Sequence, residues 1–482
     1  MNTNDIVQKL WNLCNILKDD GITYHQYVTE LTQLMFLKMA EETKQEQRLP
    51  KSCRWANLRG KDGNTLAHDY RAMLVDLGAA PDKLVAAIYA NAHTNIREPK
   101  HLAQLIDDID HIEWYGKSRE DLGDLYEGLL QKNATETKSG AGQYFTPRPL
   151  IDCMVQLMQP KHNEIIQDPA SGTGGFLINA FAYIKKHTKD LFDLSEAEQN
   201  FLMKKAFHGV ELVPDTQRLG LMNCMLHGLE GVIQVGNSLG VDGERLPKAD
   251  LILTNPPFGT KRGGGLPTRT DFTYPTSNKQ LAFLQHIYRG LKPGGRAAVV
   301  LPDNVLFESN TGAEIRRDLM DKCNLHTILR LPTGIFYAQG VKTNVLFFAR
   351  GEKDKGNTKE VWVFDLRANM PQFGKRTVLG LEHFEEFIKA FGKDPLGSAK
   401  SLARRKDTGE AGRFRKFTRE QIAERGDSLD IAWLKDDSEG ANDELPEPTV
   451  LAKQAMEELS GALDELRGIM EELGEEIDEV EA

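Results

Sequence analysis

Short apolar segments alternate with helical patterns between residues 164 and 349, and this alternation constrains the fold more than any other feature. We expect strands at residues 164–167, 207–211, 233–235, 250–254, 297–301, 327–330 and 344–349. Because helical patterns separate most of them, the sequence predicts an α/β domain with a doubly wound parallel sheet. The last strand follows its neighbour too closely for a helical crossover, so we expect it to run antiparallel.

The residues before this alternation look helical. Apolar side chains recur on one helical face at Val28, Leu31 and Met35, and again at Leu125 and Leu129. Four parts are therefore expected along the chain: a helical N-terminal domain (1–140), an α/β domain (141–400), a basic and irregular connection (401–448) and an acidic C-terminal helix (449–482).

The C-terminal helix carries a heptad pattern. Its apolar residues recur in alternating steps of three and four, at Met456, Leu459, Leu463, Leu466, Met470, Leu473, Ile477 and Val480. From Leu434 to Ala482 there are seventeen acidic and three basic residues, which give this tail a formal charge of −14. Because the whole chain has a formal net charge of −11, the rest of the chain carries +3. Identical copies of so acidic a helix would repel one another. The helix could pack on its own domain, or it could contact a different and more basic chain.

The cysteines and histidines argue against two kinds of site. The five cysteines lie far apart without a CxxC pair, and there is no HExxH motif. We therefore expect reduced thiols and no metal. The N-terminal sequence MNTNDIVQKL has no apolar signal region, and no segment suits a membrane span, so we expect a cytoplasmic protein.

The sequence DPASGTGGFL (168–177) follows an expected strand and predicts a tight turn into a helix. Gly172 and Gly174 let the backbone approach a ligand, and the helix start offers free N–H groups. The loop is neither a GK[ST] phosphate loop nor a GxGxxG motif, so it supports neither a nucleoside triphosphate nor a nicotinamide cofactor. It is either the site of another cofactor or a plain strand–helix turn. Asp168 could accept from an ammonium group or fix the first turn.

Two further polar side chains stand at the ends of expected strands, where ligands of α/β sheets bind. Glu211 ends the second strand and could accept from both hydroxyls of a ribose, or it could be a surface carboxylate. Asn237 follows the third strand, where its amide could meet the edge of an adenine ring.

The fourth expected strand ends in the sequence NPPF (255–258). The amide oxygen of Asn255 and the carbonyl oxygen of Pro256 can accept both N–H bonds of one exocyclic amine. The prolines fix the backbone and offer no competing N–H. Two such acceptors favour a pyramidal nitrogen whose lone pair can attack an electrophile, and Phe258 can stack on the base that carries it.

These motifs resemble those of one family. NPPF after an apolar strand resembles the catalytic motif of amino-methylating DNA methyltransferases, and DPASGTGGF resembles their S-adenosyl-L-methionine loop. GQYFTPRPL (142–150) resembles the segment that covers the methionine end of that cofactor, and the order of the three motifs is that of the N6-adenine class. Together with ELTQLMFLKMAEE, LGDLYEGLL, GVELVPDTQRLGLMN and LPTGIFYAQGVKTNVLFF, they are similar to the modification subunit of type I restriction-modification systems over nearly the whole chain.

The resemblance implies a role for each matching residue. The target adenine would be held by Asn255, Pro256 and Phe258, with Phe336 or Tyr337 as a second aromatic wall. The cofactor would be bound by Gln143, Tyr144, Phe145, Thr146, Pro147, Arg148, Asp168, Ser171, Gly172, Thr173, Gly174, Glu211 and Asn237.

The implied reaction is direct transfer of a methyl group from the sulfonium of S-adenosyl-L-methionine to N6 of an adenine flipped out of double-stranded DNA. No Pro-Cys pair is present to supply the nucleophile of C5-cytosine methylation. The resemblance also implies partners: a specificity subunit that reads the DNA and binds two modification subunits, and a restriction subunit that translocates and cuts, in a bacterium or archaeon.

Three questions stay open at this point. The basic segments at residues 260–272 and 402–420 could contact DNA or could be solvated. A glutamine side-chain methyltransferase also uses an NPP-aromatic motif, but it usually lacks the GQYFTP segment and the long helical additions. An assembly subunit with an inactive methyltransferase fold would not need the complete loop, Glu211 and NPPF.

Overall fold

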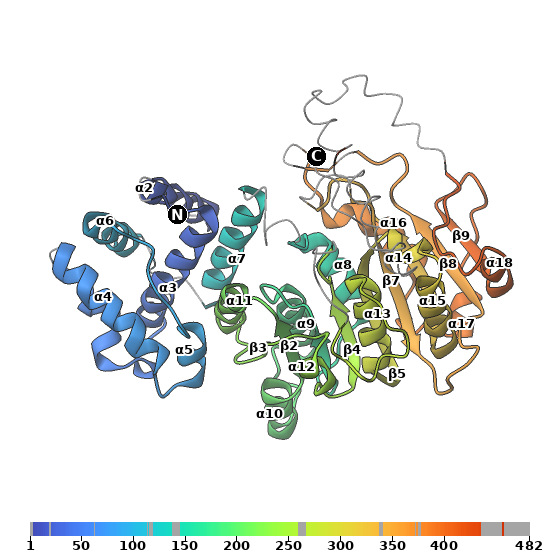
Figure 1. The fold of residues 1–482 in the computed structure, drawn as a ribbon, viewed down its shortest axis with the longest axis horizontal. Coiled ribbons are helices and arrows are strands. Elements are labelled where there is room, and N and C mark those ends of the chain that lie inside the picture. Colours follow the sequence, from blue (N-terminus) through green and yellow to red (C-terminus); the bar gives the residue numbers. More distant parts are fainter. Residues whose placement is uncertain are drawn as a thin grey trace, which may run out of the picture. The chain divides into compact units, whose positions relative to one another are not determined.

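The computed structural model describes residues 3–18, 21–61, 63–112, 114, 119–136, 145–258, 267–336, 341–371, 373–374, 377–434 and 456. The chain divides into two compact units, Met1–Arg367 with Gln372–Leu434 and Ala368–Pro371 with Lys435–Ala482. All helices and strands named below lie in the first unit (Figure 1). The predicted heptad helix, except for Met456, lies outside the described residues.

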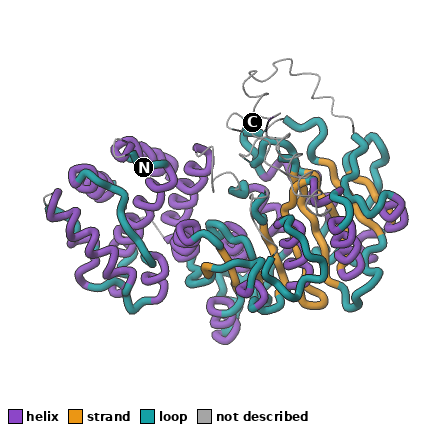
Figure 2. Tube along the Cα trace, in the orientation of Figure 1, coloured by secondary structure: helices purple, strands orange, loops and turns teal. Residues whose placement is uncertain are grey.

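The N-terminal part is helical, as predicted, and its described residues before 145 form helices and loops (Figure 2). Its helices are α1 (Thr3–Asn12), α2 (Cys14–Lys18), α3 (Tyr24–Glu42), α4 (Gly63–Gly78), α5 (Lys83–Ile88), α6 (Pro99–Asp110) and α7 (Arg119–Glu136). Helix α3 begins at a capping box, in which the Thr23 hydroxyl accepts from the backbone N–H of Gln26 and the Gln26 side chain accepts from that of Thr23. Leu31, Leu34 and Met35 are fully buried, and α3 packs against α6 and α7.

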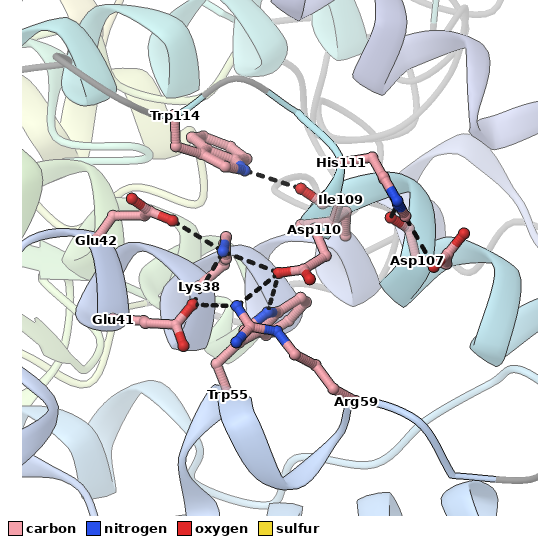
Figure 3. Close-up of polar contacts among 10 residues, drawn as sticks. All are labelled: Lys38, Glu41, Glu42, Trp55, Arg59, Asp107, Ile109, Asp110, His111 and Trp114. Atoms are coloured by element: carbon pink, nitrogen blue, oxygen red, sulfur yellow. Dashed lines mark hydrogen bonds and ion pairs between the residues drawn. The ribbon is translucent and has the colours of Figure 1, made fainter.

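A charged cluster on α3 ties these helices together (Figure 3). The side chain of Lys38 is 4% exposed and forms ion pairs with Glu41, Glu42 and Asp110 at 2.8–2.9 Å. Arg59 donates to Glu41 and Asp110 at 2.7 and 2.8 Å. Burial raises the pKa of Asp110, but hydrogen bonds from Arg59 and Lys38 outweigh it and hold that pKa well below its usual range. The cluster therefore links α3, α6 and the connection before α4.

A nine-stranded sheet forms the remainder of the unit. Its strands are β1 (Ile166–Asp168), β2 (Phe207–Glu211), β3 (Ile233–Val235), β4 (Ala249–Thr254), β5 (Leu291–Pro302), β6 (Cys323–Arg330), β7 (Thr343–Arg350), β8 (Glu360–Asp365) and β9 (Phe414–Thr418). Its helices are α8 (Arg148–Met158), α9 (Gly175–His187), α10 (Glu196–Lys204), α11 (Pro214–Leu226), α12 (Val241–Glu244), α13 (Lys279–Gly290), α14 (Asn304–Phe307), α15 (Thr311–Lys322), α16 (Glu385–Phe391), α17 (Ala399–Leu402) and α18 (Arg419–Glu424).

The strand order is β3-β2-β1-β4-β5-β7-β6-β8-β9 (Figure 1). Strands β1 to β5 pair in parallel, and β6 pairs in parallel with β8. Strand β7 runs antiparallel to both β5 and β6, which confirms the direction predicted for residues 344–349. That strand is not the last, because β8 and the antiparallel β9 extend the sheet further. The sheet is thus mixed but mostly parallel.

The core of the sheet domain lies between the central strands and helices α13 and α15. Ile252, Val299 and Leu346 from three strands pack with Leu284 and Leu319 from the two helices, all at most 1% exposed. Each such side chain contributes roughly 1.5–3 kcal/mol of burial free energy, so the positions of the central strand ends are rigidly supported. Within the described residues, no helix has the length and apolar character that crossing a membrane requires.

The segment at residues 402–420, expected to be irregular and either to contact DNA or to be solvated, contains regular elements. Phe414–Thr418 is the edge strand β9, and α18 follows it directly. The guanidinium of Arg405 lies over the rings of Phe391 and Phe414, at 5.1 and 5.6 Å from their centroids. That of Arg415 lies 5.3 Å from the ring centroid of Phe417. These two arginines therefore pack on aromatic side chains of their own domain.

Candidate active site

The site begins where β1 and β4 lie side by side. Strands β2 and β3 extend the sheet on one side of β1, and β5 extends it beyond β4, so the order reverses between β1 and β4. In open α/β sheets the crevice at the carboxyl ends of such strands is where ligands bind. The last residue of β1 is Asp168 and the last residue of β4 is Thr254, so the two candidate motifs start next to each other.

A buried hydrogen bond joins the two strand ends. The Thr254 hydroxyl donates to Asp168 Oδ1 at 2.7 Å, and the backbone N–H of Ala170 donates to the same oxygen at 3.1 Å. Asp168 is 1% exposed, and this burial raises its pKa to about 7. The bond from Ala170 shows that Asp168 fixes the first turn, and its contact with an ammonium group stays a prediction.

The glycine-rich turn between β1 and α9 has the backbone that its sequence predicts. Gly172 and Gly174 have φ of 52° and 83°, the left-handed region that favours glycine. A Cβ on Gly174 would lie 2.8 Å from Cys224 Sγ, whereas nothing lies within 4 Å of a Cβ on Gly172. The space above Gly172 is therefore open. Beside it, the Ser171 hydroxyl is buried and has no hydrogen-bond partner among the described residues.

Glu211 closes the turn from the neighbouring strand. One carboxylate oxygen accepts from the backbone N–H of Gly172 at 3.0 Å and the other from that of Val213 at 2.9 Å. Burial raises the pKa of Glu211 above its usual value, and these two backbone donors partly offset the rise. Each carboxylate oxygen can accept a second hydrogen bond, so Glu211 retains the capacity to bind a diol.

Asn237 follows β3 and stabilises its own turn. Its Oδ1 accepts from the backbone N–H of Leu239 at 3.0 Å, and its backbone N–H donates to Asp242 Oδ2 at 2.9 Å. The prediction of an adenine contact considered only Asn237. The structure adds Asp242 at the same turn, an acceptor that no motif in the sequence marked.

The Asn255 side chain lies between β4 and the segment before α8. Asn255 is 8% exposed, and its Nδ2 donates to the Thr146 hydroxyl oxygen at 2.9 Å. Pro256 is buried and Pro257 is exposed. The predicted base-binding and cofactor-covering motifs are therefore in direct contact, although 109 residues separate them in sequence.

Phe258, three residues after Asn255, contacts a second aromatic ring. Phe258 and Phe336 are 6% and 3% exposed, and their rings meet edge to face with centroids 5.4 Å apart and planes at 87°. Phe336 thus supports Phe258 from the side. Gln143, Tyr144 and Tyr337 lie outside the described residues, while Phe145 and Pro147 are half-buried.

Arg148, expected in the cofactor site, contacts two acidic side chains. It donates to Glu127 of α7 and to Asp152 at 3.2 Å. Glu127, Asp124 and His227 bring one possible metal ligand each to within 4.8 Å of one another. Glu127 also pairs with Arg148 of α8.

Arg269 lies in residues 260–272, the basic segment that could contact DNA or be solvated, and its side chain is buried. Its side chain is 4% exposed and forms two hydrogen bonds with Asp271 at 2.5 and 2.6 Å. It also donates to the Ser238 carbonyl at 3.1 Å and contacts His286 Nδ1 at 2.8 Å. Burial lowers the pKa of His286 to about 3, so its ring is neutral and can accept from Arg269. Residues 259–266 lie outside the described part of the chain.

Family profiles match three parts of the chain. The profile described as "N-6 DNA Methylase" matches residues 117–439. The profile "HsdM N-terminal domain" matches residues 6–109, and "Type I restriction enzyme methylase subunit, C-terminal domain" matches residues 445–482. The first profile spans more than half of the chain and defines the class of the protein, an N-6 DNA methylase.

Individual relatives narrow that class. The type I restriction enzyme EcoKI methylase subunit of Escherichia coli (strain K12) is 54% identical, over 98% of this chain and 96% of its own. The StySPI methylase subunit of Salmonella potsdam has the same identity and coverage. The crystal structure of the EcoKI M protein has 48% identity and a TM-score of 0.57, with 98% of this chain and 97% of that chain covered. A chain from a structural study of type I R-M complex assembly has 27% identity, a TM-score of 0.71 and 98% of each chain covered.

The chain therefore belongs to the methylase subunits of type I restriction enzymes, within the N-6 DNA methylase family. Its reaction is adenine-specific DNA methylation.

Proposed function

We propose that this chain binds S-adenosyl-L-methionine at the carboxyl ends of β1 and β2 and transfers its methyl group to N6 of an adenine flipped out of double-stranded DNA. The observation that carries the proposal is the contact between Asn255 and Thr146, because it brings the NPPF motif to the segment expected over the cofactor. The reversal of strand order at β1 and β4 supports the same location. The connection from β1 leads to β2 on one side, and the connection from β4 leads to β5 on the other side. If both crossovers are right-handed, as such connections almost always are, their helices cover opposite faces of the sheet, which is the doubly wound arrangement.

The residues around the glycine turn fit this cofactor. The turn leaves open space above Gly172, and the buried Ser171 hydroxyl and the second lone pairs of Glu211 face no other described partner that would use them. Glu211 would accept from the ribose hydroxyls, and Thr173 and Gly174 would lie under the amino-acid part. Asn237 would meet the adenine ring of the cofactor. Phe145 and Pro147 would cover the methionine end together with Gln143 and Tyr144.

The main contribution of the protein to this reaction would be to position the adenine amine against the methyl group of the cofactor. S-adenosyl-L-methionine supplies a methyl group on a sulfonium, which is already activated for transfer. Asn255 Oδ1 and the Pro256 carbonyl would accept the two N–H bonds of the adenine amine, so that its lone pair points at the methyl carbon. Phe258 would stack on the flipped base, and its contact with Phe336 holds the ring in place. Water can accept the proton that N6 releases during or after attack.

The partners of the reaction follow from the family. We infer that a separate specificity subunit reads the DNA sequence, that two methylase subunits bind to it, and that a restriction subunit joins them, in the cytoplasm of a bacterium or archaeon. The acidic heptad pattern at residues 449–482 is the proposed docking element for the specificity subunit. A basic helical partner would suit its charge.

One experiment tests the reaction and its rivals together. The chain and its specificity subunit are incubated with methyl-labelled cofactor and host genomic DNA that lacks the modification. Label recovered as N6-methyladenine supports the proposal. Label in protein would indicate glutamine methylation, and no incorporation, with cofactor binding also absent, would indicate an inactive assembly subunit.

A further inference from the structure

Asn255 is the residue on which the proposed reaction depends most, and its amide has two ends of opposite character. Oδ1 can only accept a hydrogen bond and Nδ2 can only donate. The two ends have nearly the same shape, so packing alone does not distinguish them. If Nδ2 instead of Oδ1 pointed at the target base, it would meet the N–H groups of the adenine amine, and two donors would face each other.

The strand residues that precede Asn255 hold its backbone in place. Thr254, the preceding residue, is tied to Asp168 by the 2.7 Å hydrogen bond between their side chains. Leu253 pairs with Ala298 of β5 in the parallel register, and Thr254 pairs with Val299.

Thr146 contacts the side chain of Asn255 directly. Its hydroxyl oxygen accepts a hydrogen bond from Asn255 Nδ2 at 2.9 Å, which holds the amide with Nδ2 toward Thr146 and leaves Oδ1 at the other end. Asn255 is 8% exposed, and water has little access to replace the threonine. Thr146 is held in turn by the start of α8, where Pro147 is the N-cap and Pro149 lies in the first turn.

We propose that Thr146 is a positioning residue for the methyl transfer, which orients the Asn255 amide so that Oδ1 accepts from the target amine. This inference rests on the proposed function of Asn255 and goes beyond it, since Thr146 was expected only to line the cofactor site. The same contact couples the segment expected over the cofactor to the NPPF motif. A displacement of residues 145–147 would therefore disorient Asn255 Oδ1, the proposed acceptor for the adenine amine.

The test compares three variants in the complex with the specificity subunit. Thr146→Val keeps the shape and removes the hydroxyl, and Thr146→Ser keeps the hydroxyl. Thr188→Val removes a buried hydroxyl at the end of α9, where it bonds only backbone carbonyls, and serves as the matched control. Single-turnover transfer of labelled methyl into DNA is measured at saturating cofactor, and cofactor binding is measured separately by calorimetry.

We expect Thr146→Val to lower the single-turnover rate about tenfold, the equivalent of one lost hydrogen bond. Thr146→Ser should recover most of that loss, and Thr188→Val should leave the rate at the wild-type value. If Thr146 acted only through the cofactor, the rate of Thr146→Val would return to normal at saturating cofactor. That result, or an equal loss in the Ser and Val variants, would overturn the inference. Failure of the wild-type complex to methylate adenine would instead overturn the proposed function.

Discussion

Replacing Asp168 by Asn should change how the stability of the protein depends on pH. Asp168 is 1% exposed, and its pKa is raised to about 7 from an ordinary 3.8 because burial disfavours the charged form. Asn has the shape of the neutral acid and keeps an oxygen for the hydrogen bonds from Thr254 and Ala170. It removes only the cost of ionising a buried carboxyl.

The sign of the effect follows from proton binding. Between pH 3.8 and 7 the carboxyl is ionised in the unfolded chain and protonated in the folded one, so the wild-type free energy of unfolding falls as pH rises. Between pH 5 and pH 8 the wild-type protein should lose up to about 3 kcal/mol through this group, at roughly 1.4 kcal/mol per pH unit below the folded pKa. Because the amide side chain of the Asp168→Asn variant does not titrate, the variant should gain that amount relative to wild type over the same interval.

Urea unfolding of both proteins at pH 5, 6, 7 and 8 measures the difference. Other titrating groups are common to both proteins and largely cancel, except Glu211, whose charge also raises the pKa of Asp168. A Thr254→Val variant with Asp168 intact controls for loss of the hydrogen bond. A difference between Asp168→Asn and wild type that stays constant from pH 5 to pH 8 would refute the reasoning.

Three further changes test other parts of the structure. Asn255→Ala should abolish detectable methyl transfer and leave cofactor affinity within about threefold, the range of one weak contact; a variant that still methylates N6 would exclude the assigned acceptor. Lys38→Met should lower the free energy of unfolding by about 2 kcal/mol, because it leaves three carboxylates without their buried partner, although their own exposure of 22–30% screens part of the cost. An unchanged urea midpoint would show that the cluster does not stabilise α3. Deleting residues 450–482 should leave cofactor binding intact and weaken co-purification with the specificity subunit; undiminished co-purification would rule out the tail as the docking element.

Much of the sheet was predictable because its strands are short, apolar and bounded by turns. The ranges expected for β2 and β3 agree with the structure to the residue. The antiparallel direction of β7 followed from the short connection before it. β8 and β9 were missed. Residues 414–418 combine two aromatic and two basic side chains, a composition that an exposed DNA-binding segment shares with an edge strand.

In the candidate site, motifs of consecutive residues were predictable from the sequence, whereas contacts between residues far apart in the sequence were not. NPPF and the glycine turn were recognisable because their chemistry is contained in a few consecutive residues. The contact of Thr146 with Asn255 and that of Thr254 with Asp168 join residues 109 and 86 positions apart, and no local pattern records them. The basic segments 260–272 and 402–420 were expected at the surface. The sequence did not reveal that the Arg269 side chain, paired with Asp271, is only 4% exposed, or that Arg405 lies over the ring of Phe391.

The central claim is that Asn255, Pro256 and Phe258 present one adenine amine to the cofactor methyl group. It is tested most directly by mapping the methyl group on DNA modified by the wild-type complex and by its Asn255→Ala counterpart. We expect N6-methyladenine at one recurring sequence with the wild-type complex and none with the variant. Methylation by both, or methyl groups found on cytosine with the wild-type complex, would contradict the account.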